Sequence, residues 1–211
     1  MAIFLDSANH DEIREAIASG FVAGITTNPA LLVAAGTVGL EALQPLCELV
    51  PGRVFYQLTT GDLNAMLLES QAAVAISPSQ VVLKVPCSWD GLRVVARLSL
   101  ELPCAMTAVF SPAQAYLARE AGARYVIPYL NRSTRLMGDG VALISAIAQV
   151  LNGNHCGGTE ILAASIKSPT EAVAALNAGA QHLALPLEVI HEMARHPLSE
   201  MAIQEFRRLT Q

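Results

Sequence analysis

The chain has 211 residues, of which 53% are hydrophobic and 15% are charged, and its formal net charge is −5. This length suffices for one large core and is short for two ordinary domains, so we expect a single domain over residues 1–211. The negative charge offers no basic face, which argues against nucleic acid and against a membrane surface as partners.

The N-terminal segment Met1–Asp6 has no basic residue and soon reaches an acidic one, which is not the pattern of a signal peptide. A cytoplasmic location is therefore expected. The four cysteines are scattered without a C-x-x-C pair, and His191 and His196 have the wrong spacing for two ligands on one helical face. The sequence accordingly predicts no metal site.

Short apolar segments alternate with helical ones along the chain, as in parallel α/β proteins. One amphipathic run, around Glu12–Ile17, follows Asn9 as a plausible N-cap, and another spans Gly138–Leu151, ahead of a predicted loop at Asn152–Gly158. Eight segments have the composition of strands: Ile3–Asp6, Ala23–Thr27, Val54–Leu58, Val81–Val85, Cys104–Val109, Tyr125–Tyr129, Ile161–Ser165 and His182–Leu185. Eight such units predict a compact single-domain (β/α)₈ TIM barrel, with an open doubly wound sheet as the alternative.

An internal repeat favours the barrel. Residues 111–123 match residues 168–180 at an offset of 57, which fits two strand-helix units. In each copy a serine, Ser111 or Ser168, is the expected N-cap, a proline follows at the first helical position, and a glycine ends the helix. Repeated units of this kind indicate quasi-symmetry within one domain.

The chain has one helical run more than a barrel needs. After the last predicted strand come Leu187–Arg195 and then Pro197–Gln211, where Leu198, Met201 and Phe206 follow a helical period. This extra C-terminal helix is expected either to cover the barrel or to pack on a neighbouring subunit, and we favour the neighbour. The low content of charged residues also favours a homo-oligomer.

Lys84 stands in the apolar stretch Val81–Pro86, which has the composition of a buried strand. A buried ammonium group is costly unless it finds a carboxylate or loses its proton. The chain has only two lysines, Lys84 and Lys167, against eleven arginines, and a neutral lysine, unlike arginine, is a nucleophile toward a carbonyl carbon. Lys84 is therefore either a Schiff-base nucleophile or a structural lysine that pairs with an acid or extends toward solvent.

Polar residues gather where the predicted strands end, which is the face that carries the chemistry of such barrels. Each alone has an ordinary explanation, such as a helix cap, a turn or a satisfied core group. Because they all fall at one end of the same barrel, we expect a single site. In strand order they are Asp6, Thr27, Asn28, Gln57, Lys84, Thr107, Tyr129, Arg132, Ser165 and Lys167.

The chemistry expected there starts when the Lys84 amine attacks a ketone and loses water, leaving an iminium ion that accepts electrons as the adjacent carbon–carbon bond breaks or forms. Tyr129, Gln57 and Thr107 are expected to hold a water for the proton transfers, and Asp6 and Asn28 to bind substrate hydroxyl groups.

A phosphate site is expected beside these groups. Arg132, Ser165 and Lys167 stand near a helix that Ser168 and Pro169 open, and cations together with backbone N–H groups at a helix N-terminus suit a phosphate. Simple surface charge is the alternative for Lys167. With Thr27 and Asn28, these residues form the predicted substrate-binding set.

Four motifs resemble, in order and spacing, those of the transaldolase family, specifically its short fructose-6-phosphate aldolase-like branch. The resemblance spans essentially the whole chain. It implies a Schiff-base barrel without metal or organic cofactor, acting on phosphorylated or free ketoses, with the nucleophile at Lys84. It also implies pentamers, paired into decamers, in which the C-terminal helix, here Pro197–Phe206, is exchanged between subunits. The motifs are Leu5–Asn9, Gly24–Pro29, Val82–Pro86 and Leu162–Ser165.

Two activities compete within this family. Transaldolases carry a glutamate on the third strand and typically a phenylalanine at the end of the sixth, whereas aldolases that release free dihydroxyacetone carry glutamine and tyrosine. Gln57 and Tyr129 therefore favour an aldolase that cleaves fructose 6-phosphate, or a similar ketose, into dihydroxyacetone and glyceraldehyde 3-phosphate. A transaldolase that passes the dihydroxyacetone unit between sugar phosphates is the alternative, and a sugar-phosphate-binding barrel without covalent chemistry is the alternative from another class.

The chain departs from the family pattern at two positions. Ala30 stands where a serine is usual, and Thr134 stands where an aspartate often follows the Arg132 segment. Both changes are expected to alter the recognition of substrate hydroxyl groups.

Overall fold

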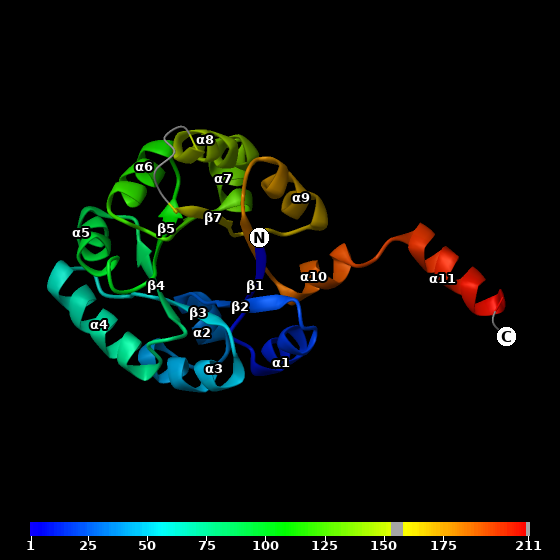
Figure 1. The fold of residues 1–211 in the computed structure, drawn as a ribbon, viewed down its shortest axis with the longest axis horizontal. Helices are drawn as coiled ribbons and strands as arrows, with labels where there is room; N and C mark the ends of the chain where they lie inside the picture. Colours follow the sequence, from blue (N-terminus) through cyan, green and yellow to red (C-terminus); the bar gives the residue numbers. More distant parts are fainter. Residues whose placement is uncertain (153–157, 210–211) are drawn as a thin grey trace.

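The computed structural model describes residues 1–152 and 158–209, in which eight parallel strands form a closed barrel (Figure 1). The strands follow one another in chain order, and β8 pairs with β1. This closure confirms the (β/α)₈ TIM barrel and excludes the open sheet. The strands are β1 Ala2–Asp6, β2 Val22–Thr26, β3 Arg53–Gln57, β4 Val81–Pro86, β5 Cys104–Val109, β6 Tyr125–Pro128, β7 Glu160–Ala163 and β8 His182–Leu185.

All eight strands lie where the sequence predicted them, and their ends differ from the prediction by two residues at most. The differences arise where pairing continues past the regular strand. Thr27 follows β2 but still donates its backbone N–H to Phe55 O, and Leu58 follows β3 and donates to Lys84 O. Strand ends are thus set by contacts with the next strand, which no local pattern records.

The barrel interior is an apolar floor with a polar layer above it. Alternate residues of a strand point to the same face. On β1, β3, β4, β5 and β6, the residue two positions after the floor residue therefore points into the barrel one layer nearer the C-terminal end, and for β6 this residue directly follows the strand. These polar residues are Asp6, Gln57, Lys84, Thr107 and Tyr129. The floor residues are Phe4, Phe55, Val82, Ala105, Ile127, Leu162, Ala164 and Ala184.

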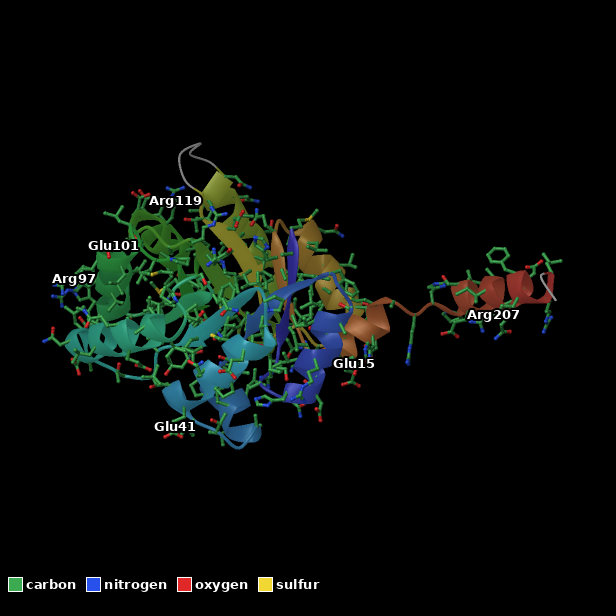
Figure 2. The ribbon with its side chains drawn as sticks, turned by 60° about the horizontal axis from the view of Figure 1, so that its bottom comes forward. Glu15, Glu41, Arg97, Glu101, Arg119 and Arg207 are labelled. Carbon is green, nitrogen blue, oxygen red and sulfur yellow. The ribbon has the colours of Figure 1, made fainter. Side chains whose placement is uncertain are left out.

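Helices surround the barrel and bury a second apolar core against the outer face of the sheet (Figure 1). Charged side chains such as Glu15, Glu41 and Arg97 lie on the outer surface (Figure 2). The helices are α1 His10–Ala18, α2 Pro29–Ala34, the 3₁₀ helix η1 Gly39–Ala42, α3 Leu43–Leu49, α4 Leu63–Ile76, α5 Trp89–Leu98, α6 Pro112–Glu120, α7 Leu130–Met137, α8 Gly140–Asn152, α9 Pro169–Asn177, α10 Leu187–Met193 and α11 Pro197–Leu209.

The predicted caps of the internal repeat are confirmed. The Ser111 hydroxyl accepts the backbone N–H of Gln114 at the start of α6, and the Ser168 hydroxyl accepts that of Glu171 at the start of α9. The glycines that end the two helices have φ angles of 88° at Gly122 and 105° at Gly179, which an L side chain rarely adopts. Asn9 likewise caps α1 as predicted.

The region between β6 and β7 holds two helices. The predicted run over Gly138–Leu151 corresponds to α8, and α7 precedes it, ending at Gly138 with φ 97°. The predicted loop begins later than expected because Asn152 still belongs to α8, and residues 153–157 lie outside the described residues. Within the described part of the chain no single helix has the length and apolarity to cross a bilayer; α7 and α8 reach them only jointly, with a bend of 115°.

The C-terminal helix α11 projects from the barrel (Figure 1). None of its residues is buried, and its apolar side chains are exposed, with Leu198 at 67% and Leu209 at 79%. It therefore does not cover the barrel of its own chain. Residues 210–211 of the predicted helix lie outside the described residues.

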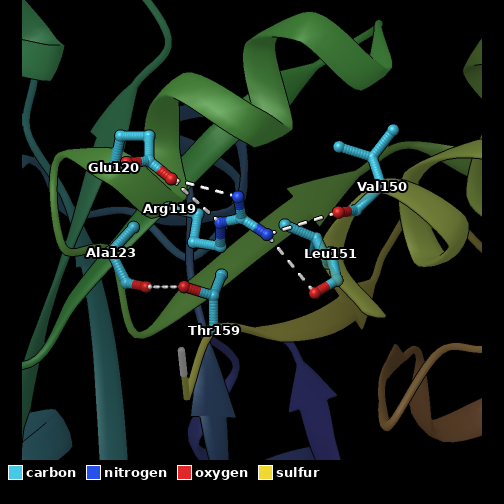
Figure 3. A network of polar contacts seen from close by, with 6 residues as sticks. All are labelled: Arg119, Glu120, Ala123, Val150, Leu151 and Thr159. Carbon is cyan, nitrogen blue, oxygen red and sulfur yellow. Dashed lines mark hydrogen bonds and ion pairs between the residues drawn. The ribbon is translucent and has the colours of Figure 1, made fainter. Parts of the chain in front are cut away.

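The N-terminal end of the barrel carries a polar network around Arg119 (Figure 3). The side chain of Arg119 is 6% exposed and forms an ion pair of 3.0 Å with Glu120. Its Nη1 also donates to Val150 O at 3.3 Å and to Leu151 O at 3.4 Å. The guanidinium thus joins α6 to the last carbonyl groups of α8.

Candidate active site

A cavity of about 560 Å³ opens at the C-terminal end of the barrel. Its wall consists of the polar side chains above the apolar floor and of residues in the loops that follow the strands. Eight of the ten predicted site residues line it. Its lining residues are Asp6, Asn28, Pro29, Ala30, Leu31, Gln57, Lys84, Tyr129, Asn131, Arg132, Arg135, Ala164, Ser165 and Lys167.

Lys84 is buried, with 3% of its surface exposed. Its Nζ donates to Thr27 O at 2.9 Å, and Lys84 forms no ion pair with any described residue. The structural alternative of a lysine that pairs with an acid or reaches solvent therefore does not describe this side chain. The protonated Lys84 has three N–H bonds, and because Thr27 O accepts one of them, two remain available. After loss of a proton the amine also has a lone pair.

Burial lowers the pKa of Lys84 from 10.5 to about 8. The Asp6 carboxylate opposes this by favouring the charged form, and the Arg132 guanidinium adds to the lowering. At neutral pH a usable fraction of such an amine is neutral, whereas an ordinary lysine has almost none. The cavity thus holds a nucleophilic amine at accessible pH.

Asp6 lies at the end of β1 and lines the same cavity. Its Oδ1 accepts a hydrogen bond of 2.8 Å from the Thr26 hydroxyl. It does not cap α1, because Asn9 does so. Asp6 is therefore not the helix cap that was its structural alternative. Its carboxylate lines the cavity and is oriented by Thr26 on β2.

Gln57 and Tyr129 present the polar groups expected beside the lysine. Gln57 Oε1 is buried and has no hydrogen-bond partner among the described residues, and a buried amide oxygen of this kind normally has one. The Tyr129 hydroxyl shares a hydrogen bond of 2.8 Å with the Thr107 hydroxyl. Thr107 itself is fully buried and does not line the cavity, so it acts on the site through Tyr129.

Thr27 differs from its predicted role as a substrate ligand. Its hydroxyl donates to Phe55 O at 2.9 Å, and the residue does not line the cavity. The contribution of Thr27 is its carbonyl, which holds Lys84. Asn28 does line the cavity while its Oδ1 caps α2 by accepting Leu31 N, so its amide NH₂ is the group left for a ligand.

The predicted cations line one side of the cavity. Arg132 lies on α7 with its guanidinium carbon 4.9 Å from the centre of the Tyr129 ring, and Lys167 lies in the loop after β7. Arg135, one turn further along α7, also lines the cavity and was missed at the sequence level. Its spacing of three residues from Arg132 was the available signal, because residues i and i+3 share a helix face.

Ser165 lines the cavity in a strained conformation. Its φ of 57° lies in the left-handed region, which costs a non-glycine residue of order 1–3 kcal/mol and is found mainly at functional sites. The backbone around it is held by α7, since Asn131 N donates to Ser165 O at 2.9 Å and Leu130 N donates to Ala164 O at 2.9 Å.

The helix N-terminus expected at the phosphate site is not among the residues that line the cavity. The N–H of Glu171 is taken by Ser168, and Pro169 has none. The groups in the cavity lining with the charge to hold an anion are therefore the side chains of Arg132, Arg135 and Lys167. Of the two departures from the family pattern, Ala30 lines the cavity and Thr134 does not. The Thr134 hydroxyl donates to Leu130 O and accepts the backbone N–H of Gly140.

Among the residues that the structure describes, no cluster of three or more histidine, cysteine or acidic side chains is placed to hold a metal ion. Cys47 and Cys104 are buried and Cys87 is half-buried, while Cys156 lies outside the described residues.

The chain is similar to known proteins over nearly its whole length. The family model described as Transaldolase/Fructose-6-phosphate aldolase matches residues 3–211. A probable transaldolase of Syntrophobacter fumaroxidans is 36% identical over 98% of this chain and 95% of its own length. A probable transaldolase of Oceanobacillus iheyensis is 38% identical over 98% of this chain and 96% of its own.

The solved structures that resemble the chain include a mandelate oxidase variant, with a TM-score of 0.64 at 17% identity, covering 88% of this chain. The chain spans 65% of that protein's length. At this identity the likeness shows a shared barrel fold alone.

Proposed function

The chain belongs to the transaldolase/fructose-6-phosphate aldolase family, and we propose that within it the chain is a Schiff-base aldolase that cleaves fructose 6-phosphate, or a similar ketose, into dihydroxyacetone and glyceraldehyde 3-phosphate. The observation that carries this proposal is a buried Lys84 with a lowered pKa in the same cavity as Gln57 and Tyr129.

Lys84 is the nucleophile in this proposal. Its neutral Nζ attacks the ketone carbon, and loss of water gives an iminium ion. Cleavage of the carbon–carbon bond leaves its electron pair on the three-carbon unit as an enamine, while the departing fragment gives its hydroxyl proton to a base and leaves as the aldehyde. Protonation of the enamine carbon and addition of water to the iminium release dihydroxyacetone and regenerate the amine.

The neighbouring polar groups supply the proton transfers. The unpartnered Gln57 Oε1 suits a bound water, and the Tyr129 hydroxyl, held by Thr107, suits a proton donor and acceptor beside it. Asp6 and the Asn28 amide are placed to bind hydroxyl groups, and Arg132, Arg135 and Lys167 to bind the phosphate.

The choice of aldolase over transaldolase rests on Gln57 and Tyr129. A hydroxyl beside the water gives a second acid/base group for hydrolysing the imine, which favours release of the three carbons over their retention. The second candidate is a transaldolase, the activity after which the relatives of Syntrophobacter fumaroxidans and Oceanobacillus iheyensis are named.

Assays with fructose 6-phosphate alone and then with erythrose 4-phosphate separate the two. The aldolase proposal expects glyceraldehyde 3-phosphate without an acceptor, and formation of product only in the presence of erythrose 4-phosphate contradicts it. A variant with both Gln57→Glu and Tyr129→Phe is expected to lower release relative to transfer. Borohydride reduction with dihydroxyacetone tests the covalent step, and absence of an adduct on Lys84 returns the chain to a non-covalent sugar-phosphate-binding barrel.

We further propose a homo-oligomer, a pentamer or decamer, in which α11 packs on a neighbouring subunit. The exposed apolar side chains of α11 and its projection from the barrel support this (Figure 1). Sedimentation of the full chain, compared with a variant that carries Leu198→Glu and Met201→Glu, is expected to show a shift to smaller species. An unchanged mass would count against α11 as the contact.

A further inference from the structure

The cavity is lined by three cations, Arg132 and Arg135 on α7 and Lys167 in the loop after β7, which we call the cation cluster. Glu171, at the third position of α9, contacts both of the segments that carry them. Its Oε2 accepts the backbone N–H of Lys167 at 2.7 Å, and its Oε1 accepts the side-chain amide of Asn131 at 2.8 Å. Both donors belong to residues that line the cavity, whereas Glu171 does not line it. The carboxylate therefore links α7 to the loop after β7 from behind the cavity wall.

The internal repeat shows that this link exceeds what the helix cap requires. In the first copy Gln114 occupies the equivalent position, and its Oε1 accepts the backbone N–H of Phe110 at 2.8 Å. That bond corresponds to the one from Lys167 N to Glu171. The glutamine amide nitrogen accepts no hydrogen bond, so only a carboxylate offers the second acceptor that Asn131 uses.

The bonds of Glu171 complete a closed set around the strained residue of the site. Asn131 N donates to Ser165 O, and Asn131 Nδ2 and Lys167 N both donate to Glu171. Ser165, with its left-handed φ of 57°, lies inside this set. The equivalent residue of the first copy, Ala108, has the same φ, so the left-handed backbone belongs to the repeat, and the bonds of Glu171 fix the position of the loop that contains it.

From this arrangement we propose that Glu171 is a positioning residue that sets the anion-binding side of the cavity by joining Asn131 and Lys167. The inference rests on the proposed use of that side for the phosphate of a ketose phosphate. Glu171 touches no substrate in this proposal; it fixes the spacing between the α7 cation Arg132 and the loop that carries Ser165 and Lys167.

The sign of one effect separates positioning from plain electrostatics. Glu171→Gln keeps an oxygen for Lys167 N, as in the first copy, and removes the acceptor for Asn131. It also removes a negative charge near an anion site, which by Coulomb's law alone strengthens phosphate binding. Positioning predicts the opposite, a loss of affinity for inorganic phosphate of about tenfold, as expected for one charge-assisted hydrogen bond.

Glu69→Gln is the matched control. Glu69 lies on α4 and accepts the backbone N–H groups of Thr59 and Thr60 in the loop after β3, at the same end of the barrel. None of these three residues lines the cavity. The Glu69 carboxylate also accepts the hydroxyl groups of Thr59, Thr60 and Tyr56. The variant therefore removes the same charge and disturbs more contacts than Glu171→Gln does, but none of them involves Arg132, Arg135 or Lys167, and its phosphate affinity is expected to equal that of the wild type.

The experiment measures inorganic phosphate binding by calorimetry for the wild type, Glu171→Gln, Glu69→Gln, Asn131→Ala and the double variant of Glu171 and Asn131. We expect weaker binding in Glu171→Gln, and no further loss when that change is added to Asn131→Ala. Unchanged or tighter binding in Glu171→Gln, an equal loss in Glu69→Gln, or a fully additive double variant overturns the inference.

Two further readouts on the same proteins keep this inference distinct from the proposed function. The KM for fructose 6-phosphate is expected to rise in Glu171→Gln, while the adduct that dihydroxyacetone forms on Lys84 stays at the wild-type level because dihydroxyacetone has no phosphate. A wild type without any adduct refutes the Schiff-base proposal and leaves the phosphate result to decide the role of Glu171. A normal adduct with unchanged phosphate affinity refutes the role of Glu171 alone.

Discussion

The two ends of the barrel each hold a cavity, of about 560 Å³ at the C-terminal end and about 530 Å³ at the N-terminal end, and each has a buried cation beside it. Arg119 at the N-terminal end has an exposed carboxylate and two helix carbonyls as partners (Figure 3). Lys84 at the C-terminal end has one carbonyl and no ion pair with a described residue.

The difference separates stability from chemistry. A satisfied buried cation contributes hydrogen bonds and stays charged, whereas a poorly satisfied one costs stability and gives up its proton more readily. The unpartnered oxygen of Gln57 lies at the same end as Lys84. This end therefore carries features that a structural role alone leaves unexplained.

The largest expected effect comes from Lys84→Met. We expect complete loss of the dihydroxyacetone adduct after borohydride reduction, because Lys84 is the lysine on a barrel strand and the chain's other lysine, Lys167, lies in the loop after β7. The free energy of unfolding at pH 7 is expected to rise by about 1–3 kcal/mol, since an unpaired buried charge is replaced by an apolar chain. Adduct mass mapping and urea denaturation check the two effects, and a less stable variant would show that Lys84 is structural.

Arg119→Met is the converse change at the other end. The free energy of unfolding is expected to fall by about 2–4 kcal/mol, because the α8 carbonyls lose a charged donor. The adduct on Lys84 is expected to form at the wild-type rate. Denaturation and adduct formation on the same samples measure both, and unchanged stability would remove the contrast between the two cations.

The pH dependence of Lys84 tests the same contrast quantitatively. In the folded protein its pKa is about 8, and in the unfolded chain it is near 10.5. Below pH 8 both states are protonated and the folded protein bears the full cost of the buried charge. Between pH 8 and 10.5 the unfolded state binds more protons, so the free energy of unfolding rises with pH.

The wild type is therefore expected to gain about 3 kcal/mol relative to Lys84→Met between pH 7 and pH 10.5. Urea denaturation of both proteins across this range measures the difference, in which the other titrating groups cancel. Adduct formation in the wild type is expected to rise with a midpoint near pH 8. A profile that is flat from acid to neutral pH, or that rises only above about pH 10, contradicts a pKa near 8.

The smallest effects concern Ser165 and Ala108, the two non-glycine residues with a left-handed backbone in the part of the chain that the structure describes, both with φ 57°. Replacing either with glycine is expected to raise the free energy of unfolding by about 0.5–1 kcal/mol, because relief of the backbone strain outweighs the greater conformational entropy of glycine in the unfolded chain. Only Ser165→Gly is expected to weaken phosphate binding, since Ala108 does not line the cavity. Equal phosphate affinities in the two variants would separate the strain at Ser165 from ligand binding.

The sequence alone determined the local elements and the central residue. Apolar runs placed all eight strands, the serine–proline pairs placed the starts of α6 and α9, and the scarcity of lysine singled out Lys84. These signals act within a few residues of the chain, because strand alternation, helix caps and residue composition are local properties. The resemblance to the family added the reaction class.

Only the tertiary structure decided where side chains point once strands from distant parts of the chain meet. The Thr27 hydroxyl donates to Phe55 O, and Thr107 contacts the Tyr129 hydroxyl without lining the cavity. Thr134 forms its hydrogen bonds at the α7–α8 junction and not in the cavity. The tertiary structure also brought Asn131 within 2.8 Å of Glu171, forty residues later in the chain. Such contacts depend on barrel closure and strand register, which are set by pairing between strands and leave no mark in any short segment.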